Sequence, residues 1–141
     1  MAIKTINPYL FFDGNASDAV TFYEKALDAK VVRMMRFSDG PGAAEMTPGQ
    51  PDGVMHAQLD AGGGTLLISD ARPGTPFTPG DTRVQVCLQY EGRADIDRHF
   101  AALAEGGVIE EPLKDQFWGG RFGLLVDKFG VNWMFNATLT E

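Results

Sequence analysis

The sequence predicts an α+β fold in which two βαβββ modules pair their curved sheets around a cavity. Three observations support this prediction. The order of expected strands and helices occurs twice along the 141 residues, the two helical patterns fall at the same place in each half, and a glycine-containing turn precedes the last strand of each half. A chain of this length buries roughly 70% of its unfolded surface as one domain, so the modules are expected to form one structural domain overall.

The first module is assigned to residues 1–71. Its helix is expected to begin after Asn15, a residue type that caps helix N-termini, and to carry apolar residues at helical spacing. Stretches rich in β-branched and aromatic residues predict four strands. They lie at residues 5–12, 30–37, 54–61 and 65–69. Residues 38–53 are dense in Gly and Pro and are expected to form a long loop.

The second module is assigned to residues 83–141, after a connector at residues 72–82 that three prolines stiffen. Its helix has apolar residues at positions i, i+4 and i+7, namely Ile96, Phe100 and Leu103, and ends at two glycines. Strands are expected at residues 83–90, 108–111, 121–127 and 132–138, with a loop at residues 113–120.

Individual residues of the two halves also correspond. The matched pairs are Gly14 with Gly92 and Phe22 with Phe100, at an offset of 78 (92 − 14), and Gly64 with Gly130, at an offset of 66 (130 − 64). The offset changes because the first half has the longer internal loop. A helix covers only one face of a sheet, so each module leaves its concave face open. Pairing two such faces would make a partly closed barrel whose lumen is the natural ligand site.

Composition narrows the class of function. The formal net charge of −7 argues against nucleic acid and an anionic membrane surface as partners. The single cysteine, Cys87, excludes an internal disulfide and suits a reducing compartment. The N-terminus lacks the pattern of a signal peptide, and no stretch approaches the roughly 20 apolar residues of a membrane span. These features predict a soluble cytoplasmic protein.

The sequence resembles the vicinal-oxygen-chelate (glyoxalase, bleomycin-resistance and dioxygenase) superfamily, and within it the PhnB-like branch. The resemblance rests on four segments, at residues 8–27, 64–70, 99–107 and 117–136, of which the last is the most specific. It implies the paired βαβββ fold, a small-molecule ligand and a homodimer. Proteins with this signature often carry the name of a 3-demethylubiquinone methyltransferase. We expect no such activity here, because the glycine run at residues 62–64 lies between two strands and not between a strand and a helix.

The resemblance also indicates where a metal would bind. In metal-using relatives, the first and last strands of each module supply one ligand each, usually His or Glu. Carried over one by one, those positions fall at Pro8, Ile68, Gln85 and Met134, and a shift of one residue offers Asn7, Ser69 and Phe135. None of these is a good ligand for a hard or borderline metal ion. We therefore expect no metal and no cofactor.

His56 and Gln58 are the first candidate ligand-binding residues, because they share one face of the strand at residues 54–61. If that face lines the cavity, both side chains can hydrogen-bond a ligand, and His56 can act as a general base near neutral pH. The catalytic residue, if there is one, is otherwise unknown. The alternative is a histidine that anchors a loop or is satisfied in the core. His99 lies beside Arg98 on a helix and is expected on the solvated surface.

Gln85, Trp118 and Arg121 complete the candidate ligand-binding residues. Trp118 can stack on a planar ligand and Arg121 can clamp a carboxylate or phosphate. The alternatives are that Trp118 plugs one end of the barrel and that Arg121 pairs with a carboxylate such as Asp127. Gln85, at a position where metal-using relatives have a metal ligand, can hydrogen-bond a ligand or simply fill the cavity.

The remaining aromatic residues and the cysteine are assigned passive roles. Tyr9, Phe11, Trp133 and Phe135 are expected to form core or to line the cavity passively. Cys87 has no basic neighbour in sequence and is expected to be buried and inert.

Three functions are compatible with these residues. The first is a metal-independent small-molecule-binding protein of the glyoxalase/bleomycin-resistance type. The alternative is a glyoxalase- or dioxygenase-like enzyme (isomerase, lyase or oxidoreductase) that uses a divalent metal or His56 as acid-base. The third is a structural or regulatory dimer whose cavity is filled by side chains.

Overall fold

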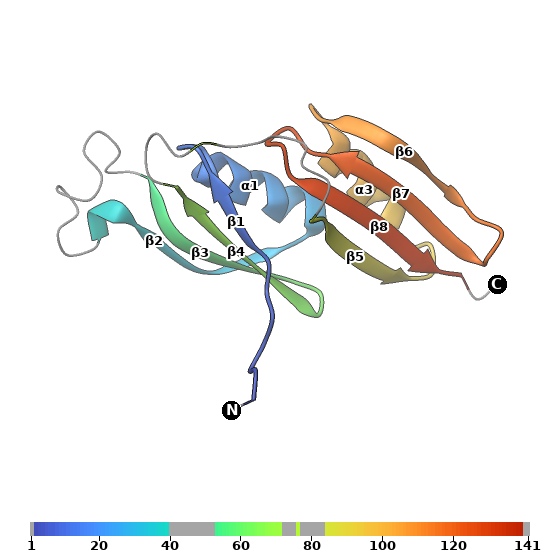
Figure 1. Cartoon of the computed structure of the whole chain (residues 1–141), viewed down its shortest axis with the longest axis horizontal. Helices are drawn as coiled ribbons and strands as arrows, with labels where there is room; N and C mark the ends of the chain where they lie inside the picture. Colours follow the sequence, from blue (N-terminus) through green and yellow to red (C-terminus); the bar gives the residue numbers. More distant parts are fainter. Residues whose placement is uncertain (1, 40–52, 72–75, 77–83, 140–141) are drawn as a thin grey trace. The chain divides into compact units, whose positions relative to one another are not determined.

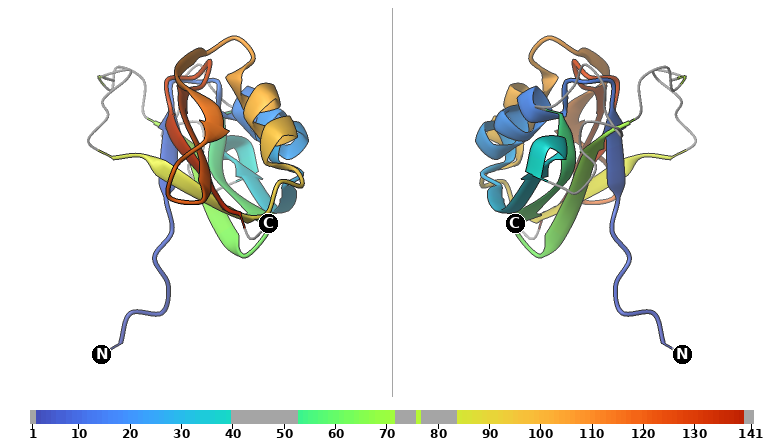
Figure 2. Two further views of the ribbon diagram at one scale, coloured as in Figure 1. Left: turned by 90° about the vertical axis from the view of Figure 1, so that its right-hand side faces the viewer. Right: turned by 90° about the vertical axis from the view of Figure 1, so that its left-hand side faces the viewer.

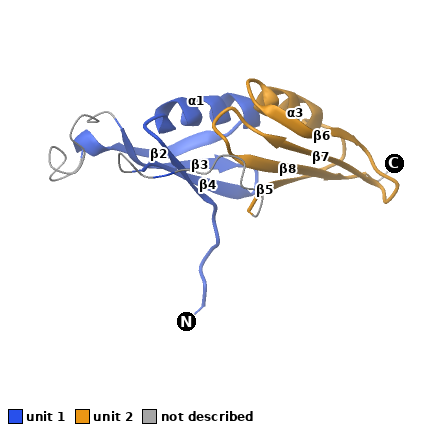
Figure 3. Ribbon diagram, turned by 45° about the horizontal axis from the view of Figure 1, so that its top comes forward, with its two compact units in different colours: residues 1–76 blue, residues 77–141 orange. Residues whose placement is uncertain are grey.

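The computed structural model describes residues 2–39, 53–71, 76 and 84–139. The chain divides into two compact units, residues 1–76 and residues 77–141 (Figure 3). The boundary falls within the predicted connector, and most of that connector lies outside the described residues, as does most of the predicted loop at residues 38–53.

The first unit follows the predicted order of one strand, one helix and three strands (Figure 1). Its elements are β1 (Tyr9–Phe12), α1 (Ala16–Leu27), β2 (Lys30–Arg36), the 3₁₀ helix η1 (Phe37–Asp39), β3 (Val54–Ala61) and β4 (Gly64–Asp70). The strands form one sheet in the order β1-β4-β3-β2, in which β1 is parallel to β4 and the other neighbours are antiparallel. The glycine run joins β3 to β4 as a hairpin turn, as predicted.

Helix α1 packs on one face of this sheet (Figure 2). Along β3 and β4, alternate residues face the helix and are fully or nearly fully buried. These are Ala57 and Leu59 on β3, paired with Ile68 and Leu66 on β4. The opposite face is not covered by any described element of the same unit.

The second unit repeats this arrangement. Its elements are β5 (Val86–Glu91), α3 (Ile96–Ala104), β6 (Val108–Asp115), β7 (Gly120–Val126) and β8 (Asn132–Thr138). The sheet order, β5-β8-β7-β6, corresponds strand for strand to that of the first unit, and β5 is again parallel to β8. The predicted βαβββ order is therefore confirmed in both units.

The second unit has an aromatic core between α3 and its sheet. Phe135 is fully buried, makes an edge contact with Phe100 at 5.0 Å between ring centroids, and stacks on Tyr90 at 6.0 Å. Gly123 lies opposite Phe135 on β7, and a Cβ there would come within 2.8 Å of the Phe100 ring. Glycine is therefore required for the close approach of this helix to its sheet.

Asp70 ties the start of α1 to the start of β3. Asn15 occupies the N-cap position, as predicted, but its side chain makes no capping hydrogen bond. The buried Asp70 carboxylate accepts the N–H of Ala16 at 2.9 Å through one oxygen and that of Val54 at 2.9 Å through the other. An anion at this end of the helix also interacts favourably with the helix dipole.

Three predicted boundaries were wrong. The strand predicted at residues 83–90 begins at Val86, because its ladder with β8 begins with the pairing of Val86 and Trp133. The first strand begins at Tyr9 and not at residue 5, because ladder partners on β4 begin with the pairing of Tyr9 and Leu67. Strand β6 runs on to Asp115, through part of the predicted loop at residues 113–120. Pro112 interrupts the β6 ladder, which shifts register there and resumes beyond it. Because proline cannot donate to a ladder, the sequence predicted that this strand ends before Pro112.

Candidate functional site

The open face of the first sheet carries the candidate His56 and Gln58. Because Ala57 and Leu59 face α1, the two-residue period of β3 turns His56 and Gln58 to the other side. The prediction that they share a face is confirmed. Both side chains are half-buried.

Two aromatic rings from β1 lie on the same face. Tyr9 and Phe11 pair with Leu67 and Ser69 of β4, and their rings stack with centroids 4.8 Å apart and planes 11° from parallel. They remain 41% and 53% exposed respectively. They were expected to be passive core or lining residues, but they form an exposed platform of nearly parallel rings.

The platform is linked to His56 by a hydrogen bond. The Tyr9 hydroxyl and His56 Nδ1 are 3.0 Å apart, and the rings have centroids 5.9 Å apart. If the hydroxyl donates to Nδ1, the neutral imidazole carries its proton on Nε2. The pair then presents one ring N–H, fixed in orientation by Tyr9. This contact of a tyrosine and a histidine makes Tyr9 the main site residue that the sequence reasoning missed.

Strand β2 completes the open face at its far edge. Arg33 lies directly opposite Gln58 in the ladder, and Met35 lies opposite His56. The Gln58 amide donates to Asp60 at a long 3.4 Å. This face thus runs from aromatic rings on β1, through polar side chains on β3, to a guanidinium on β2. We call Tyr9, Phe11, Arg33, His56 and Gln58 the β1–β3–β2 face.

The second unit has its own open face. Cys87 and Gln89 of β5 pair with Met134 and Asn136 of β8, and the Asn136 amide donates to Gln89 at 2.9 Å. Cys87 is exposed, so the prediction of burial was wrong. The partial burial that remains raises the pKa of its thiol, which lowers the thiolate fraction at neutral pH. Gln85 lies just before β5 and is half-buried.

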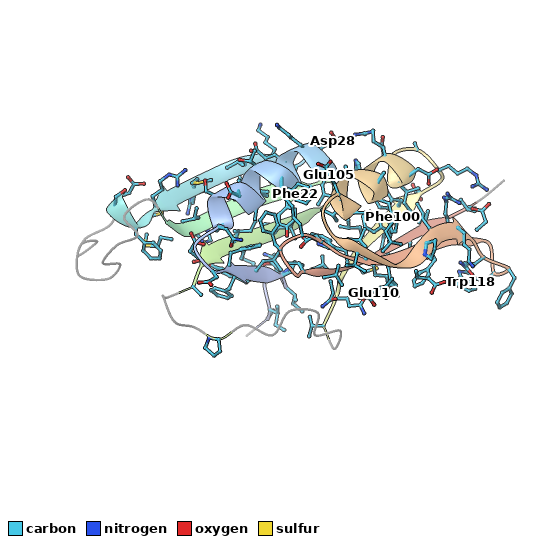
Figure 4. The ribbon with its side chains drawn as sticks, turned by 90° about the horizontal axis from the view of Figure 1, so that it is seen from above. Phe22, Asp28, Phe100, Glu105, Glu110 and Trp118 are labelled. Carbon is cyan, nitrogen blue, oxygen red and sulfur yellow. The ribbon has the colours of Figure 1, made fainter. Side chains whose placement is uncertain are left out.

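Trp118 lies in the turn that joins β6 to β7, at the end of this hairpin (Figure 4). It is 57% exposed and makes an edge contact with Phe117, which is 97% exposed, and another with Phe122. A Cβ at Gly120 would lie 2.6 Å from Trp118 Nε1, so the missing side chain lets the indole lie against the strand. Its exposure leaves it available for stacking on a planar ligand.

Arg121 is engaged within its own unit. Its guanidinium donates to Asp97 at 2.8 Å and to Asp115 at 2.9 Å. Arg93 binds the same Asp115 through two hydrogen bonds of 2.9 and 2.7 Å. Hydrogen bonds from Arg93 and then Arg121 lower the pKa of Asp115 to about 2, and the bond to Asp97 raises the pKa of Arg121. Arg121 therefore pairs with carboxylates, which was the alternative to ligand binding, and it is not part of the site.

The carboxylates that bind Arg121 are not the one named from the sequence. Asp127 is buried and accepts the backbone N–H groups of Phe129 at 2.9 Å and Val131 at 3.0 Å. Its second oxygen accepts the indole N–H of Trp133 at 2.8 Å. Asp127 thus organises the turn before β8 and anchors the buried Trp133, which explains part of the distinctive segment at residues 117–136.

His99 lies in the core and not on the solvated surface. It is only 8% exposed, and its Nδ1 lies 2.7 Å from the Tyr90 hydroxyl. The predicted solvated position was wrong, because His99 falls on the inner side of α3, three residues after Ile96 and next to Phe100. The i, i+3, i+4, i+7 pattern of a buried helix face contains this position.

The residues at the expected metal positions do not fit a hard or borderline metal ion. Ile68 faces α1 and is fully buried, so Leu67, beside Tyr9, takes its place on the open face. In the second unit Met134 lies beside Cys87. A leucine and a thioether offer no oxygen or imidazole donor. The described residues contain no group of three or more His, Cys, Asp or Glu side chains placed to hold a metal ion.

Comparison with known proteins places these features in a family. The sequence model of the Glyoxalase/Bleomycin resistance protein/Dioxygenase superfamily matches residues 5–135. Protein YjdN of Escherichia coli (strain K12) is 35% identical in an alignment of 141 positions that covers 94% of this chain and 94% of that protein. The crystal structure of PA1353 from Pseudomonas aeruginosa is similar with a TM-score of 0.84 and 36% identity, over 98% of this chain and 100% of that one.

A third similar protein is the PhnB protein of Bacillus cereus, which bears the provisional name 3-demethylubiquinone-9 3-methyltransferase. Its structure matches with a TM-score of 0.75 and 30% identity, over 96% of this chain and 100% of that one. Separately, no helix among the described residues is long and apolar enough to cross a membrane.

Proposed function

The chain belongs to the glyoxalase/bleomycin resistance/dioxygenase superfamily, in its PhnB-like branch, and we propose that it binds a small aromatic or hydrophobic molecule without the help of a metal ion. The β1–β3–β2 face of the first unit is the proposed site. Trp118, at the end of the hairpin in the second unit, offers a second stacking surface.

One observation carries this proposal. Tyr9 and Phe11 form an exposed, nearly parallel pair of rings beside a histidine whose orientation Tyr9 fixes. Aromatic side chains next to a few directed polar groups are the usual lining of small-molecule sites. A ring that contributes stacking alone is worth about 0.5–1.5 kcal/mol.

Metal independence is supported by the donor atoms. The open-face positions of the last strands hold Leu67 and Met134, and neither is a ligand for Zn²⁺, Ni²⁺, Mn²⁺ or Mg²⁺ in proteins of this kind. Binding is therefore expected to survive removal of divalent ions.

The test is isothermal titration of a panel of planar aromatic compounds into protein treated with EDTA. We expect at least one compound to bind, and Phe11→Ala to weaken it about two- to tenfold. Val108→Ala, on exposed β6 of the other unit, is the matched control and should leave affinity unchanged. Binding that appears only with stoichiometric Zn²⁺, Ni²⁺ or Mn²⁺ would overturn metal independence, and no binding across the panel would favour a structural or regulatory dimer.

The hydrogen bond between Tyr9 and His56 favours one alternative, an isomerase, lyase or oxidoreductase in which His56 acts as general base. Should an activity be found, His56→Gln should abolish it and Tyr9→Phe should reduce it, since Tyr9 only orients the ring. Retained activity in His56→Gln would remove this alternative.

A methyltransferase activity has no support in the site. The glycine run is a hairpin turn between antiparallel strands, and each described sheet mixes parallel and antiparallel neighbours. The phosphate- and nucleoside-binding loop of a doubly wound sheet has no counterpart there. S-adenosylmethionine is expected not to raise the melting temperature.

We also propose a cytoplasmic homodimer, as the resemblance to this superfamily implies. Light scattering at micromolar concentration should give twice the mass of the 15.3 kDa chain, and a monomer would contradict the dimer.

A further inference from the structure

We propose that the ligand of the β1–β3–β2 face is an aromatic anion: a planar ring carrying a carboxylate or an acidic hydroxyl. This inference rests on the proposed function and assigns it a chemical class. The ring would stack on Phe11 and Tyr9, and the anionic group would be bound by Arg33 with His56 and Gln58 as hydrogen-bond donors.

The order of the strands separates the two kinds of contact. In the order β1-β4-β3-β2 the aromatic pair stands on one outer strand and Arg33 on the other. Three strand spacings separate their backbones by roughly 14 Å. A long arginine side chain and a ring projecting from β1 both shorten that gap. A ligand of one or two fused rings with a single polar substituent matches this layout.

Arg33 has a free charge. Its side chain is exposed, and it makes no ion pair among the described residues. Gln58, directly opposite, makes only one long hydrogen bond through its amide. A carboxylate is the group that a guanidinium binds best, through two parallel hydrogen bonds.

The open face also carries one carboxylate next to Gln58. Asp60 faces Lys30 across the β2–β3 ladder and accepts a hydrogen bond from the Thr65 hydroxyl at 3.1 Å. Its hydrogen-bond donors are the Thr65 hydroxyl and, at a long 3.4 Å, the Gln58 amide. With Lys30 and Arg33 against Asp60, the charged side chains that the β2–β3 ladder places on this face sum to +1 (2 − 1), so an anionic ligand is favoured over a cationic one.

The hydrogen-bond donors in the middle of the face suit an anionic ligand. When Tyr9 donates to Nδ1 of neutral His56, the other ring nitrogen is a donor. The Gln58 amide nitrogen donates one N–H to Asp60 at a long 3.4 Å, and its second N–H is a further donor. Two donors and a guanidinium would face the substituent, and two rings would face the aromatic body.

The experiment compares two probes of the same shape, naphthalene-2-carboxylate and naphthalene-2-carboxamide, by isothermal titration of the full chain. We expect the carboxylate to bind about three- to tenfold more tightly at low salt, with a preference that shrinks as salt rises. Arg33→Gln should remove the preference and leave the affinity of the carboxamide unchanged. Lys25→Gln, which removes an equal charge from α1 on the other side of the sheet, should leave the preference intact.

The outcomes separate the two proposals. If both probes bind equally and Phe11→Ala weakens both, the anionic class is wrong while the aromatic site stands. If Arg33→Gln keeps the preference, or Lys25→Gln abolishes it, the assignment to Arg33 is wrong. If neither probe binds, the aromatic anion is ruled out at this face and the proposed function loses its main support. Far-ultraviolet circular dichroism of Arg33→Gln checks that the exposed substitution leaves the fold unchanged.

Discussion

Asp127→Asn removes one acceptor from the core of the second unit while keeping the shape of the side chain. In the native protein one carboxylate oxygen serves the turn through two backbone N–H groups, and the other accepts the indole N–H of Trp133. An asparagine can keep the acceptor on the turn, but its NH₂ group must then point at the indole N–H. A buried donor faces a donor, and the Trp133 hydrogen bond is lost.

The expected cost follows from the burial of each partner. Trp133 is fully buried, and a hydrogen bond from a buried donor to a charged acceptor contributes about 1.5–3 kcal/mol. Asp127→Asn should therefore lower the free energy of unfolding by about 2–3 kcal/mol. Asp127→Ala also removes the acceptor of the turn. Its two half-buried N–H groups add about 0.5–1 kcal/mol each, since water can reach them in part, for a total of about 3–5 kcal/mol.

A double-mutant cycle with Trp133→Phe isolates the hydrogen bond. Trp133→Phe destabilises the core by lost packing. In that background Asp127→Asn no longer places its NH₂ group opposite an indole N–H. The coupling between the two substitutions should be about 1.5–3 kcal/mol. Urea denaturation followed by far-ultraviolet circular dichroism gives the four free energies. Calorimetry checks that each transition is two-state, because two compact units can unfold separately.

The exposed Asp13→Asn is the control and should change stability by less than about 0.5 kcal/mol. A coupling energy below about 0.5 kcal/mol would refute the argument that the carboxylate anchors Trp133. So would an Asp127→Asn variant as stable as the native protein.

Three further substitutions test other contacts. Gly123→Ala drives a methyl group into the Phe100 ring and should lower the unfolding free energy in urea by about 1–3 kcal/mol. Gly120→Ala should push the Trp118 indole away from β7, so that iodide quenches a larger share of the tryptophan fluorescence. Asp115→Asn should lower the melting temperature at pH 5–7 but not near pH 2. Because the folded-state pKa of about 2 lies below the ordinary value of 3.8, this stabilisation is present above about pH 4 and is lost as the pH falls toward 2.

A third glycine, Gly63, serves as the control for both glycine substitutions. A Cβ at Gly63 meets no atom within 4 Å, so Gly63→Ala should alter neither urea stability nor quenching appreciably. Native stability in Gly123→Ala would show that the helix can move away from the sheet at no cost. A melting-temperature difference for Asp115→Asn that persists unchanged at pH 2 would show that the two arginines do not act through the charge of Asp115.

The strands, helices and their faces were accessible to the sequence because they depend on local periodicity. The alternation of β3 placed His56 and Gln58 on one side, and the spacing of Ile96, Phe100 and Leu103 located α3. His99 fits the same helical spacing as Ile96, Phe100 and Leu103. Its polar neighbour Arg98 suggested a surface position, but the spacing of the helix decides which side His99 occupies.

The metal positions show why the site was harder to predict. The offset of 66 between the halves came from one glycine pair, whereas the ladders require 67 in the last strand, where Leu67 and Met134 are equivalent (134 − 67). An error of one residue exchanges the two faces of a strand. Ile68 was therefore assigned to the open face, although it lies in the core. Turn length, which sets this offset, is not encoded by strand periodicity.

The contact between Tyr9 and His56 depends on partners far apart in the chain. The two residues are separated by 47 positions and meet only because β1 pairs with β4 and β4 with β3. Strand order and register decide that contact, and neither can be derived from one stretch of sequence. Arg121 is similar: its partner on α3, Asp97, lies 24 positions away.

The parallel pairing of β1 with β4 also bears on the kinetics of folding. Its partners lie 58 residues apart, as for Tyr9 and Leu67, whereas the hairpin of β3 and β4 closes through a two-residue turn. Closing the longer loop costs more chain entropy, and distant contacts form slowly. We therefore expect the hairpin to form early and the first strand to dock late. The aromatic platform would then be among the last parts of the first unit to assemble, and a ribosome must release the whole of β4 before the binding surface can exist.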